Sequence, residues 1–276
     1  MNRLKKLASR APVPFGFTVT LTFIAMLVAT AVLVNRWPPE SPAWFFASAV
    51  GRVLSIIVLL ALIHRLGWIQ ATGLTQPGRW QTWLAALLLL SYTAAASTYA
   101  MSGRLDLTFL EQPLPGVTAL FILVHALLEE VAFRGLVMVA LVRVWGGTSR
   151  GLVKSVVVSS LFFAGMHVIN VAGGNPLPVV LLQSMGAFFL GIVFCSLLLS
   201  GGSLYPAVIL HGIANLAGYL ILSAHPSAGS DPSAWLLQSL LAIPPALIGL
   251  YILHAMPRRS RIPTTALSMT TVGGKR

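Results

Sequence analysis

Long apolar stretches separated by short polar breaks run through the chain as far as residue 255. A membrane-spanning helix needs about 20 mostly apolar residues. The stretches that approach this length predict spanning helices at residues 14–34, 43–63, 80–100, 116–141, 153–172, 178–199, 204–223 and 234–255. Proline, glycine and serine mark the breaks, as in Pro38-Pro39 and His225-Pro226-Ser227. The pattern therefore predicts an all-α, polytopic membrane helix bundle of about eight transmembrane helices.

The composition agrees with this pattern and argues against a soluble protein. Of the 276 residues, 57% are hydrophobic and only 9% are charged, whereas soluble domains carry roughly 25% charged residues. The formal net charge of +12 raises the alternative of nucleic-acid binding. However, the basic residues lie at the termini and in short loops rather than on one face. They are better explained as topology signals and as contacts with anionic lipid, so no nucleic-acid partner is expected.

The distribution of charge also predicts how the chain crosses the bilayer. With eight spans, both termini share one side. That side collects most of the basic residues outside the spans, namely Arg3, Lys5, Lys6, Arg10, Arg65, Arg79, Arg143, Arg150, Lys154, Arg258, Arg259, Arg261, Lys275 and Arg276. The opposite loops hold two basic and four acidic residues, which are Arg36, Arg104, Glu40, Asp106, Glu111 and Asp231. Because positive charge favours the cytoplasmic side, we expect both termini in the cytoplasm.

Three regions are expected along the chain. Residues 1–13 form a basic cytoplasmic N-terminus, residues 14–255 form one transmembrane bundle, and residues 256–276 form a basic, disordered tail. The first apolar run resembles a signal peptide, but it is of spanning length, so an uncleaved first helix is expected. The lone Cys195 allows no intrachain disulfide. In the absence of a retention signal or transit peptide, a bacterial plasma membrane is the expected location.

Charged residues inside the fourth span are the most informative feature for function. Glu129 and Glu130 lie within the apolar stretch Leu114–Val142, with Arg134 one turn further on. An ionised side chain at mid-bilayer costs at least about 2.5–3.5 kcal/mol, so these residues need a compensating reason. Glu130 and Arg134 are spaced i, i+4 and can pair. Glu129 is turned about 100° away, onto the face of His125. Either Glu129 is left as a reactive carboxylate, or all three residues form an interhelical ion cluster.

Two further spans carry polar side chains at the same spacing. Phe163 and His167 lie i, i+4 in the fifth span, and His211 and Asn215 do so in the seventh. Taken singly, Phe163 would be a packing residue and His167 would be a hydrogen-bonded core residue. The pair His211 and Asn215 would form an interhelical hydrogen bond worth about 0.6 kcal/mol.

Taken together with Glu129, the three helices offer a carboxylate, two imidazoles and a carboxamide, a set that suits hydrolysis. Glu129 would take a proton from water. The histidines would orient the water, bind a metal or protonate the leaving amine. Asn215 would donate to a developing oxyanion.

The order EExxxR (Glu129, Glu130, Arg134), FxxxH (Phe163, His167) and HxxxN (His211, Asn215) closely resembles the CPBP family. This family comprises CAAX prenyl endopeptidases and bacteriocin-processing or self-immunity proteins, also called the Abi group. The resemblance covers about residues 115–222. It implies a multi-helix intramembrane protease that hydrolyses a membrane-anchored peptide or protein within or beside the bilayer.

By that resemblance the family's roles carry over to matching residues. Glu129 becomes the base, His167 and His211 become catalytic or metal-contacting residues, and Asn215 supports the oxyanion. Glu130 and Arg134 become structural partners, and Phe163 a supporting residue.

A metal ion is one of two hypotheses for the chemistry. The family is commonly labelled metallopeptidase, and a catalytic Zn²⁺ would be held by His167, His211 and Glu129. The sequence lacks HExxH, however, and a metal-bound Glu129 could not easily also act as the free base, which would leave Glu130 for one of those roles. A metal-free site is the other hypothesis.

Two functions of other classes are also consistent with a buried polar cluster. One is a catalytically silent scaffold or immunity protein, and the other is a small proton-coupled transporter. The presence of Glu129, His167, His211 and Asn215 together argues against a scaffold, and no obvious inverted repeat supports a transporter.

The two histidines are predicted to lie at different depths in the bilayer. The predicted spans place His167 near the outer end of its helix and His211 near the inner end of its own, so convergence requires tilted or offset helices.

Overall fold

A computed structural model describes residues 3–39, 41–105, 107, 111 and 116–255 of the protein. All regular secondary structure in these residues is helical. Within them, the helices long and apolar enough to span a membrane number eight, as predicted, at Pro12–Val34, Pro42–Leu66, Trp80–Ser102, Gly116–Trp145, Ser149–Val171, Leu177–Gly201, Tyr205–Ala224 and Pro232–Ala255. The predicted C-terminal tail lies outside the described residues.

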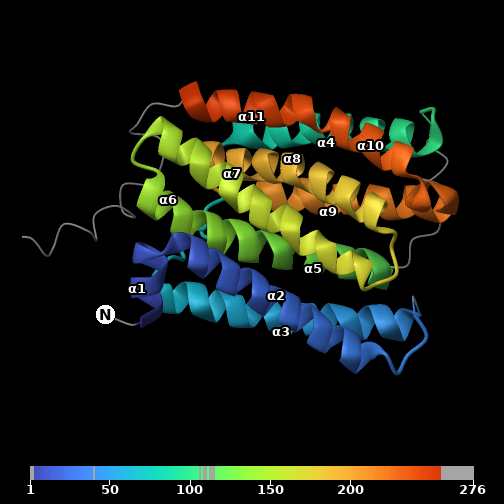
Figure 1. The fold of residues 1–276 in the computed structure, drawn as a ribbon, viewed down its shortest axis with the longest axis horizontal. Helices are drawn as coiled ribbons and strands as arrows, with labels where there is room; N and C mark the ends of the chain where they lie inside the picture. Colours follow the sequence, from blue (N-terminus) through green and yellow to red (C-terminus); the bar gives the residue numbers. More distant parts are fainter. Residues whose placement is uncertain (1–2, 40, 106, 108–110, 112–115, 256–276) are drawn as a thin grey trace, which may run out of the picture.

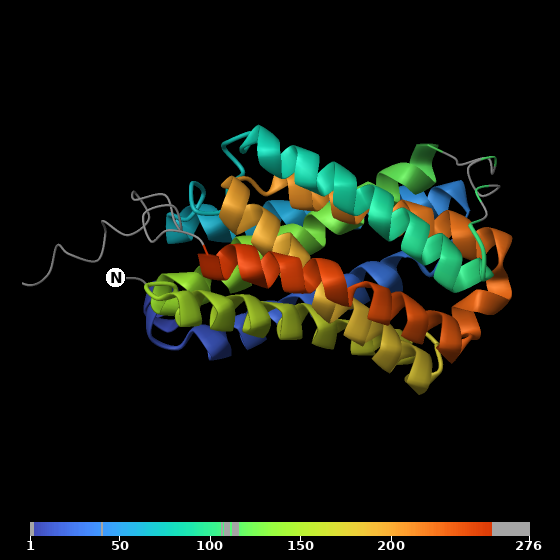
Figure 2. The same ribbon diagram turned by 90° about the horizontal axis from the view of Figure 1, so that it is seen from above.

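The helices run roughly parallel to one another in layers (Figures 1 and 2). On one side lie α2 (Pro12–Val34) and α3 (Pro42–Leu66). The opposite side is formed by α4 (Trp80–Ser102), α10 (Pro232–Leu241) and α11 (Ile243–Ala255). The short first helix α1 (Arg3–Arg10) and the last turn of α11 lie at the same end of the bundle, as an even number of spans requires. The cytoplasmic location of that end stays a prediction.

The middle of the bundle is formed by the fourth to seventh spans. They consist of α5 (Gly116–Glu130) with its continuation η2 (Val131–Met138) and α6 (Val139–Trp145), α7 (Ser149–Met166) with η3 (His167–Val171), α8 (Leu177–Gly201) and α9 (Tyr205–Ala224). Every residue from 128 to 142 is buried. The acidic pair therefore lies in the protein interior rather than against lipid, where partner side chains can offset the cost of burying charge.

The winding of the fourth span changes directly after the two glutamates. Residues Val131–Met138 form a π-helix, in which hydrogen bonds run from i to i+5 instead of i to i+4. Such segments are rare and occur frequently at functional sites. Arg134 lies inside this segment, so the wider turn sets the direction in which its side chain leaves the helix.

A loop between α3 and α4 covers the connection from α8 to α9. The Leu204 amide donates to the Gly73 carbonyl at 3.4 Å, and the Arg79 amide donates to the Gly201 carbonyl at 3.2 Å. Ser203 and Leu204 are fully buried beneath this loop. As a result the chain enters α9 from a buried connection, and only Tyr205 of its first three residues is exposed. This offset explains how His211, near the start of its helix, can lie level with the middle of the fourth span.

Gly73 is required where this loop touches the connection. Its φ of +69° is a left-handed conformation that residues with a Cβ adopt at a cost. A Cβ at this position would also lie 2.8 Å from the Gly202 carbonyl oxygen and from the Ser203 Cα. Both atoms belong to backbone, so neither can move aside cheaply.

Replacing Gly73 with alanine is therefore expected to destabilise the protein. Gly103→Ala is the matched control, since Gly103 has a φ of +71° but a Cβ there would meet no atom within 4 Å. Both variants should lose about 1–2 kcal/mol through the positive φ, and Gly73→Ala should lose roughly 1–3 kcal/mol more through overpacking. Thermal unfolding in detergent measures the difference. Equal melting temperatures for the two variants would contradict the packing role of the loop.

Candidate active site

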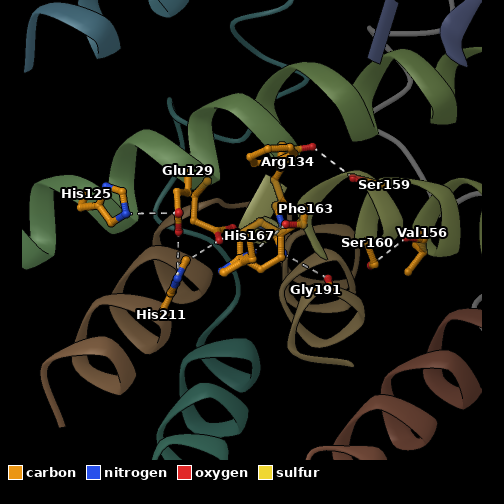
Figure 3. A network of polar contacts seen from close by, with 12 residues as sticks. His125, Glu129, Arg134, Val156, Ser159, Ser160, Phe163, His167, Gly191 and His211 are labelled. Atoms are coloured by element: carbon orange, nitrogen blue, oxygen red, sulfur yellow. Dashed lines mark hydrogen bonds and ion pairs between the residues drawn. The ribbon is translucent and has the colours of Figure 1, made fainter. Parts of the chain in front are cut away.

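Two histidines and an arginine surround the paired glutamates of α5 (Figure 3). Glu130 Oε1 lies 3.0 Å from Arg134 Nη1 and 2.8 Å from His211 Nδ1. Glu129 Oε2 lies 3.2 Å from His211 Nε2, and Glu129 Oε1 lies 3.3 Å from His125 Nε2. The predicted Glu130–Arg134 pair and the predicted proximity of Glu129 to His125 are both confirmed. In addition, His211 bridges the two glutamates, so Glu130 is more than a partner of Arg134.

A close approach of α9 to α5 makes this bridge possible. A Cβ at Gly212 would lie 2.7 Å from Leu123 Cδ2 and 3.8 Å from Leu123 Cα, so the two helices approach closely next to His211. Small residues at such contacts are the usual means by which membrane helices pack closely. The His211 ring is further held by Phe194, which stacks on it at 4.8 Å between ring centroids with an interplanar angle of 20°.

The contacts of His211 constrain where the protons lie. A carboxylate oxygen only accepts hydrogen bonds, so each of the two nitrogen–oxygen contacts needs one proton. An imidazolium satisfies both contacts when Glu129 and Glu130 are ionised. With the Arg134 guanidinium, the cluster then carries two negative and two positive charges. This balance matters because unpaired charge in the interior costs several kcal/mol.

The Phe163 ring lies against Arg134, His167 and His211. The Arg134 guanidinium carbon lies 4.2 Å from the centroid of its ring, within the range of a cation–π interaction. The same ring meets His167 edge-on at 5.1 Å and His211 edge-on at 5.7 Å. The Phe163 carbonyl accepts a hydrogen bond from His167 Nδ1 at 2.9 Å. Phe163, predicted as a supporting residue, thus orients three polar side chains at once.

The hydrogen bond to Phe163 determines the tautomer of neutral His167. Because a carbonyl oxygen only accepts, the Nδ1 atom of His167 carries the proton, and its Nε2 atom is left as an acceptor. His167 lies at the point where α7 ends and the tighter 3₁₀ helix η3 begins. Asn170 Nδ2 in η3 donates to Gln183 Oε1 of α8 at 2.8 Å, which fixes this end of the span.

A cavity of about 240 Å³ lies beside the cluster, between α4, α7, α8, α9 and α10. His167, His211 and Asn215 are on its wall, and the Asn215 side chain is exposed to it. Among the described residues, no Asp, Glu, Lys or Arg contributes to this wall. Glu129 is only 3% exposed and reaches the cavity through its contact with His211. The structure thus brings the four predicted catalytic residues together, three on the cavity and one directly behind.

The predicted metal-ligand set does not form a metal centre in this arrangement. Both ring nitrogens of His211 are directed at carboxylates, and His167 uses Nδ1 on a backbone carbonyl. In the part of the chain that the structure describes, no group of three or more His, Cys, Asp or Glu side chains is placed to hold a metal ion. The steps proposed for this site therefore use the side chains themselves.

Arg52 contacts His125 beside the glutamates, and this contact was not predicted from the sequence. Arg52 of α3 donates through Nε to His125 Nδ1 at 3.1 Å and through Nη1 to the Ser48 carbonyl at 3.0 Å. The sequence places Arg52 inside a span, where an ionisable residue is a functional hypothesis by default. The location of Arg52 inside a span was therefore a signal of function. Its partner could not be predicted, because nothing in the sequence shows that α3 packs against α5.

The buried pair predicts a specific pattern of stability. Glu130→Gln should destabilise the protein by about 3–5 kcal/mol, because it leaves the Arg134 guanidinium buried without its counter-charge. The double variant Glu130→Gln/Arg134→Met should recover most of this loss. Arg65→Met, at an exposed position of α3, is the control. Denaturant unfolding of purified protein measures all three, and a double variant no more stable than Glu130→Gln would contradict the pairing.

Comparison with known proteins identifies the region that holds the site. Residues 111–217 match the family model described as Type II CAAX prenyl endopeptidase Rce1-like. No match was found among curated proteins or among solved structures. The matched segment contains all three sequence motifs and every residue of the charged cluster. The chain is therefore an integral membrane protein in which residues 111–217 form a domain similar to the Rce1-like group of the CPBP family, and this similarity supports a CAAX-type intramembrane protease.

Proposed function

We propose that the protein is an intramembrane endopeptidase that hydrolyses peptide bonds of membrane-associated protein or peptide substrates. The observation that carries this proposal is the carboxylate of Glu129 joined through His211 to a cavity that also exposes His167 and Asn215. A base, imidazole groups and a carboxamide donor are thereby gathered at one end of a space that can hold a peptide segment. The Rce1-like domain supports the same conclusion independently.

The proposed reaction begins with a water molecule between His167 and His211. His167 Nε2, which the Phe163 carbonyl leaves as an acceptor, orients this water. Glu129 takes one proton from the water as its oxygen attacks the carbonyl carbon of the scissile bond. Once Glu129 is protonated it is no longer an anion, so its attraction for the His211 Nε2–H group weakens. That N–H and the Asn215 carboxamide then stabilise the oxyanion.

The second half of the reaction returns the proton. The tetrahedral intermediate collapses, the carbon–nitrogen bond breaks, and the proton held by Glu129 passes to the leaving amine. A new carboxyl group and a new amino group result, with water consumed and no other reactant required. Glu130 and Arg134 hold His211 in place throughout, because His211 Nδ1 stays bound to Glu130.

The cavity wall indicates the chemistry of the substrate. Apart from the two histidines, its polar groups are uncharged, as in Tyr92, Ser97, Gln183 and Gln238, and apolar side chains such as Leu190 and Trp235 complete it. We propose that the residues beside the scissile bond are uncharged, as expected for a segment anchored in the membrane. The location proposed for this activity is a bacterial plasma membrane, with the termini in the cytoplasm.

Cleavage of membrane-anchored peptides tests the proposal. Glu129→Ala, His167→Ala and His211→Ala are each expected to abolish detectable cleavage, and Asn215→Ala should lower kcat about 10²–10³-fold. His64→Ala, an exposed histidine of α3, is the control and should cleave like the wild type. Product formation is followed by mass spectrometry of purified protein in vesicles.

The same experiment distinguishes the alternatives. Cleavage by Glu129→Ala and His211→Ala at the wild-type rate would refute the proposed site. A biological phenotype that survives Glu129→Ala in a folded protein would favour the scaffold or immunity function. Proton-coupled uptake lost in these variants would favour the transporter. Metal analysis and chelator treatment of the active wild-type protein decide the zinc hypothesis.

Filling the cavity should impair cleavage without unfolding the protein. Gly218 is on the cavity wall, and a Cβ there would meet no atom within 4 Å. Gly218→Leu is therefore expected to lower kcat/KM by about 10-fold or more, because the added side chain occupies space needed by the substrate. Gly165→Leu is the matched control, since its Cβ would also be free of contacts but Gly165 is not on this wall. Equal kcat/KM for the two variants would argue against the cavity as the substrate site.

A further inference from the structure

Glu129 is held from a second direction by residues that lie outside the three sequence motifs. His125 Nε2 lies 3.3 Å from Glu129 Oε1, whereas the contact with His211 is made by the other oxygen, Oε2. His125 in turn accepts from Arg52, which reaches it from α3. Both oxygens of the carboxylate are therefore directed at an imidazole. One imidazole is tied to the acidic Glu130, and the other is tied to the basic Arg52.

The Arg52 contact determines how His125 meets Glu129. A guanidinium group only donates hydrogen bonds, so His125 Nδ1, 3.1 Å from Arg52 Nε, must be the unprotonated acceptor. The proton of the neutral ring is then on Nε2, from which it can donate to Glu129 Oε1. The opposite tautomer would place two lone pairs against each other at Glu129. Arg52 and Glu129 thus favour the same neutral form of His125, the one that donates to the carboxylate, and Arg52 keeps the proton off Nδ1.

The ring of His125 is also fixed in orientation. It stacks on Phe121 with an interplanar angle of 6° and a centroid distance of 6.1 Å. The Arg52 guanidinium carbon lies 4.4 Å from the Phe121 ring centroid, and Arg52 Nη1 donates to the Ser48 carbonyl. These contacts connect α3 to α5 through one rigid group. This group meets the catalytic cluster through the His125–Glu129 contact.

We propose that Arg52 and His125 are positioning residues for the hydrolysis described above, a proposal that rests on the proposed protease function. Arg52 fixes the Nε2–H tautomer of His125. The hydrogen bond from His125 to Glu129 Oε1 then fixes the orientation of the carboxylate, so that it can receive the proton of the attacking water. Neither Arg52 nor His125 is on the wall of the cavity, so neither contacts the substrate.

The enzymatic test compares variants of His125. His125→Leu removes the contact to Glu129 and is expected to lower kcat by about 10²-fold with little change in KM, because it misplaces the base without altering the cavity. His125→Gln offers an acceptor oxygen for Arg52 and an N–H donor for Glu129, so it should restore kcat to within about 10-fold of the wild type. His64→Leu, on the exposed face of α3, is the control and should retain wild-type kcat and KM.

A spectroscopic test examines the tautomer without requiring activity. In protein labelled with ¹⁵N-histidine, the signals of His125, identified by their loss in His125→Gln, should show a proton on Nε2 only. In Arg52→Met, which frees Nδ1 from its donor, the same signals should show a fraction of rings with a proton on Nδ1. An Nδ1–H tautomer in the wild type, or an unchanged tautomer in Arg52→Met, would overturn the proposal.

The outcomes separate this proposal from the protease function itself. Wild-type protein that cleaves no peptide defeats both. Wild-type cleavage together with an unchanged kcat in His125→Leu defeats the positioning role alone. A loss confined to KM, or an equal loss of kcat in His125→Leu and His125→Gln accompanied by a lower melting temperature, would also overturn it, because either result indicates substrate contact or a merely structural role.

Discussion

The burial of the Glu130–Arg134 ion pair is the constraint on which the rest of the structure depends. Both side chains are 0% exposed, in the middle of a helix that is itself buried from residue 128 to residue 142. Charges in such a place need partners at short distance, since removing one partner costs about 3–5 kcal/mol. Phe163 under the guanidinium and His211 on the carboxylate supply those partners. The bundle therefore has to bring α7 and α9 to this point of the fourth span. The same two spans carry His167 and Asn215.

The same constraint explains the irregular parts of the fold. The π-helix after Glu130 gives Arg134 its direction, and the buried connection before α9 moves His211 toward the middle of the bundle. The 3₁₀ turn at His167 ends α7 where its imidazole meets the cavity. Regular helices of equal length would have kept the motifs at different depths. The π-helix thus directly follows the two glutamates and a 3₁₀ helix begins at His167, and irregular winding of this kind is common at functional sites.

Hydrophobic patterning was sufficient to predict the eight spans, because each is long, apolar and bounded by turn residues. Helical spacing was sufficient for the Glu130–Arg134 pair and for the proximity of His125 to Glu129, since both are contacts within one helix. The contact of His211 with both glutamates, and that of Arg52 with His125, were not predictable in this way. Each depends on which helices are neighbours, and patterning carries no such information. The change to π winding was equally hidden, because nothing in the sequence of Val131–Met138 distinguishes π from α winding.

Single-turnover cleavage in H₂¹⁸O tests the central claim, that Glu129 activates water inside the bundle, most directly. A membrane-anchored peptide would be mixed with excess wild-type protein or with folded Glu129→Gln, which keeps the size of the side chain but removes the base. If Glu129 is the base, wild-type product carries one ¹⁸O atom in its new carboxyl group and Glu129→Gln forms no labelled product over the same time. Labelled product from Glu129→Gln at the wild-type rate would show that Glu129 is not the base.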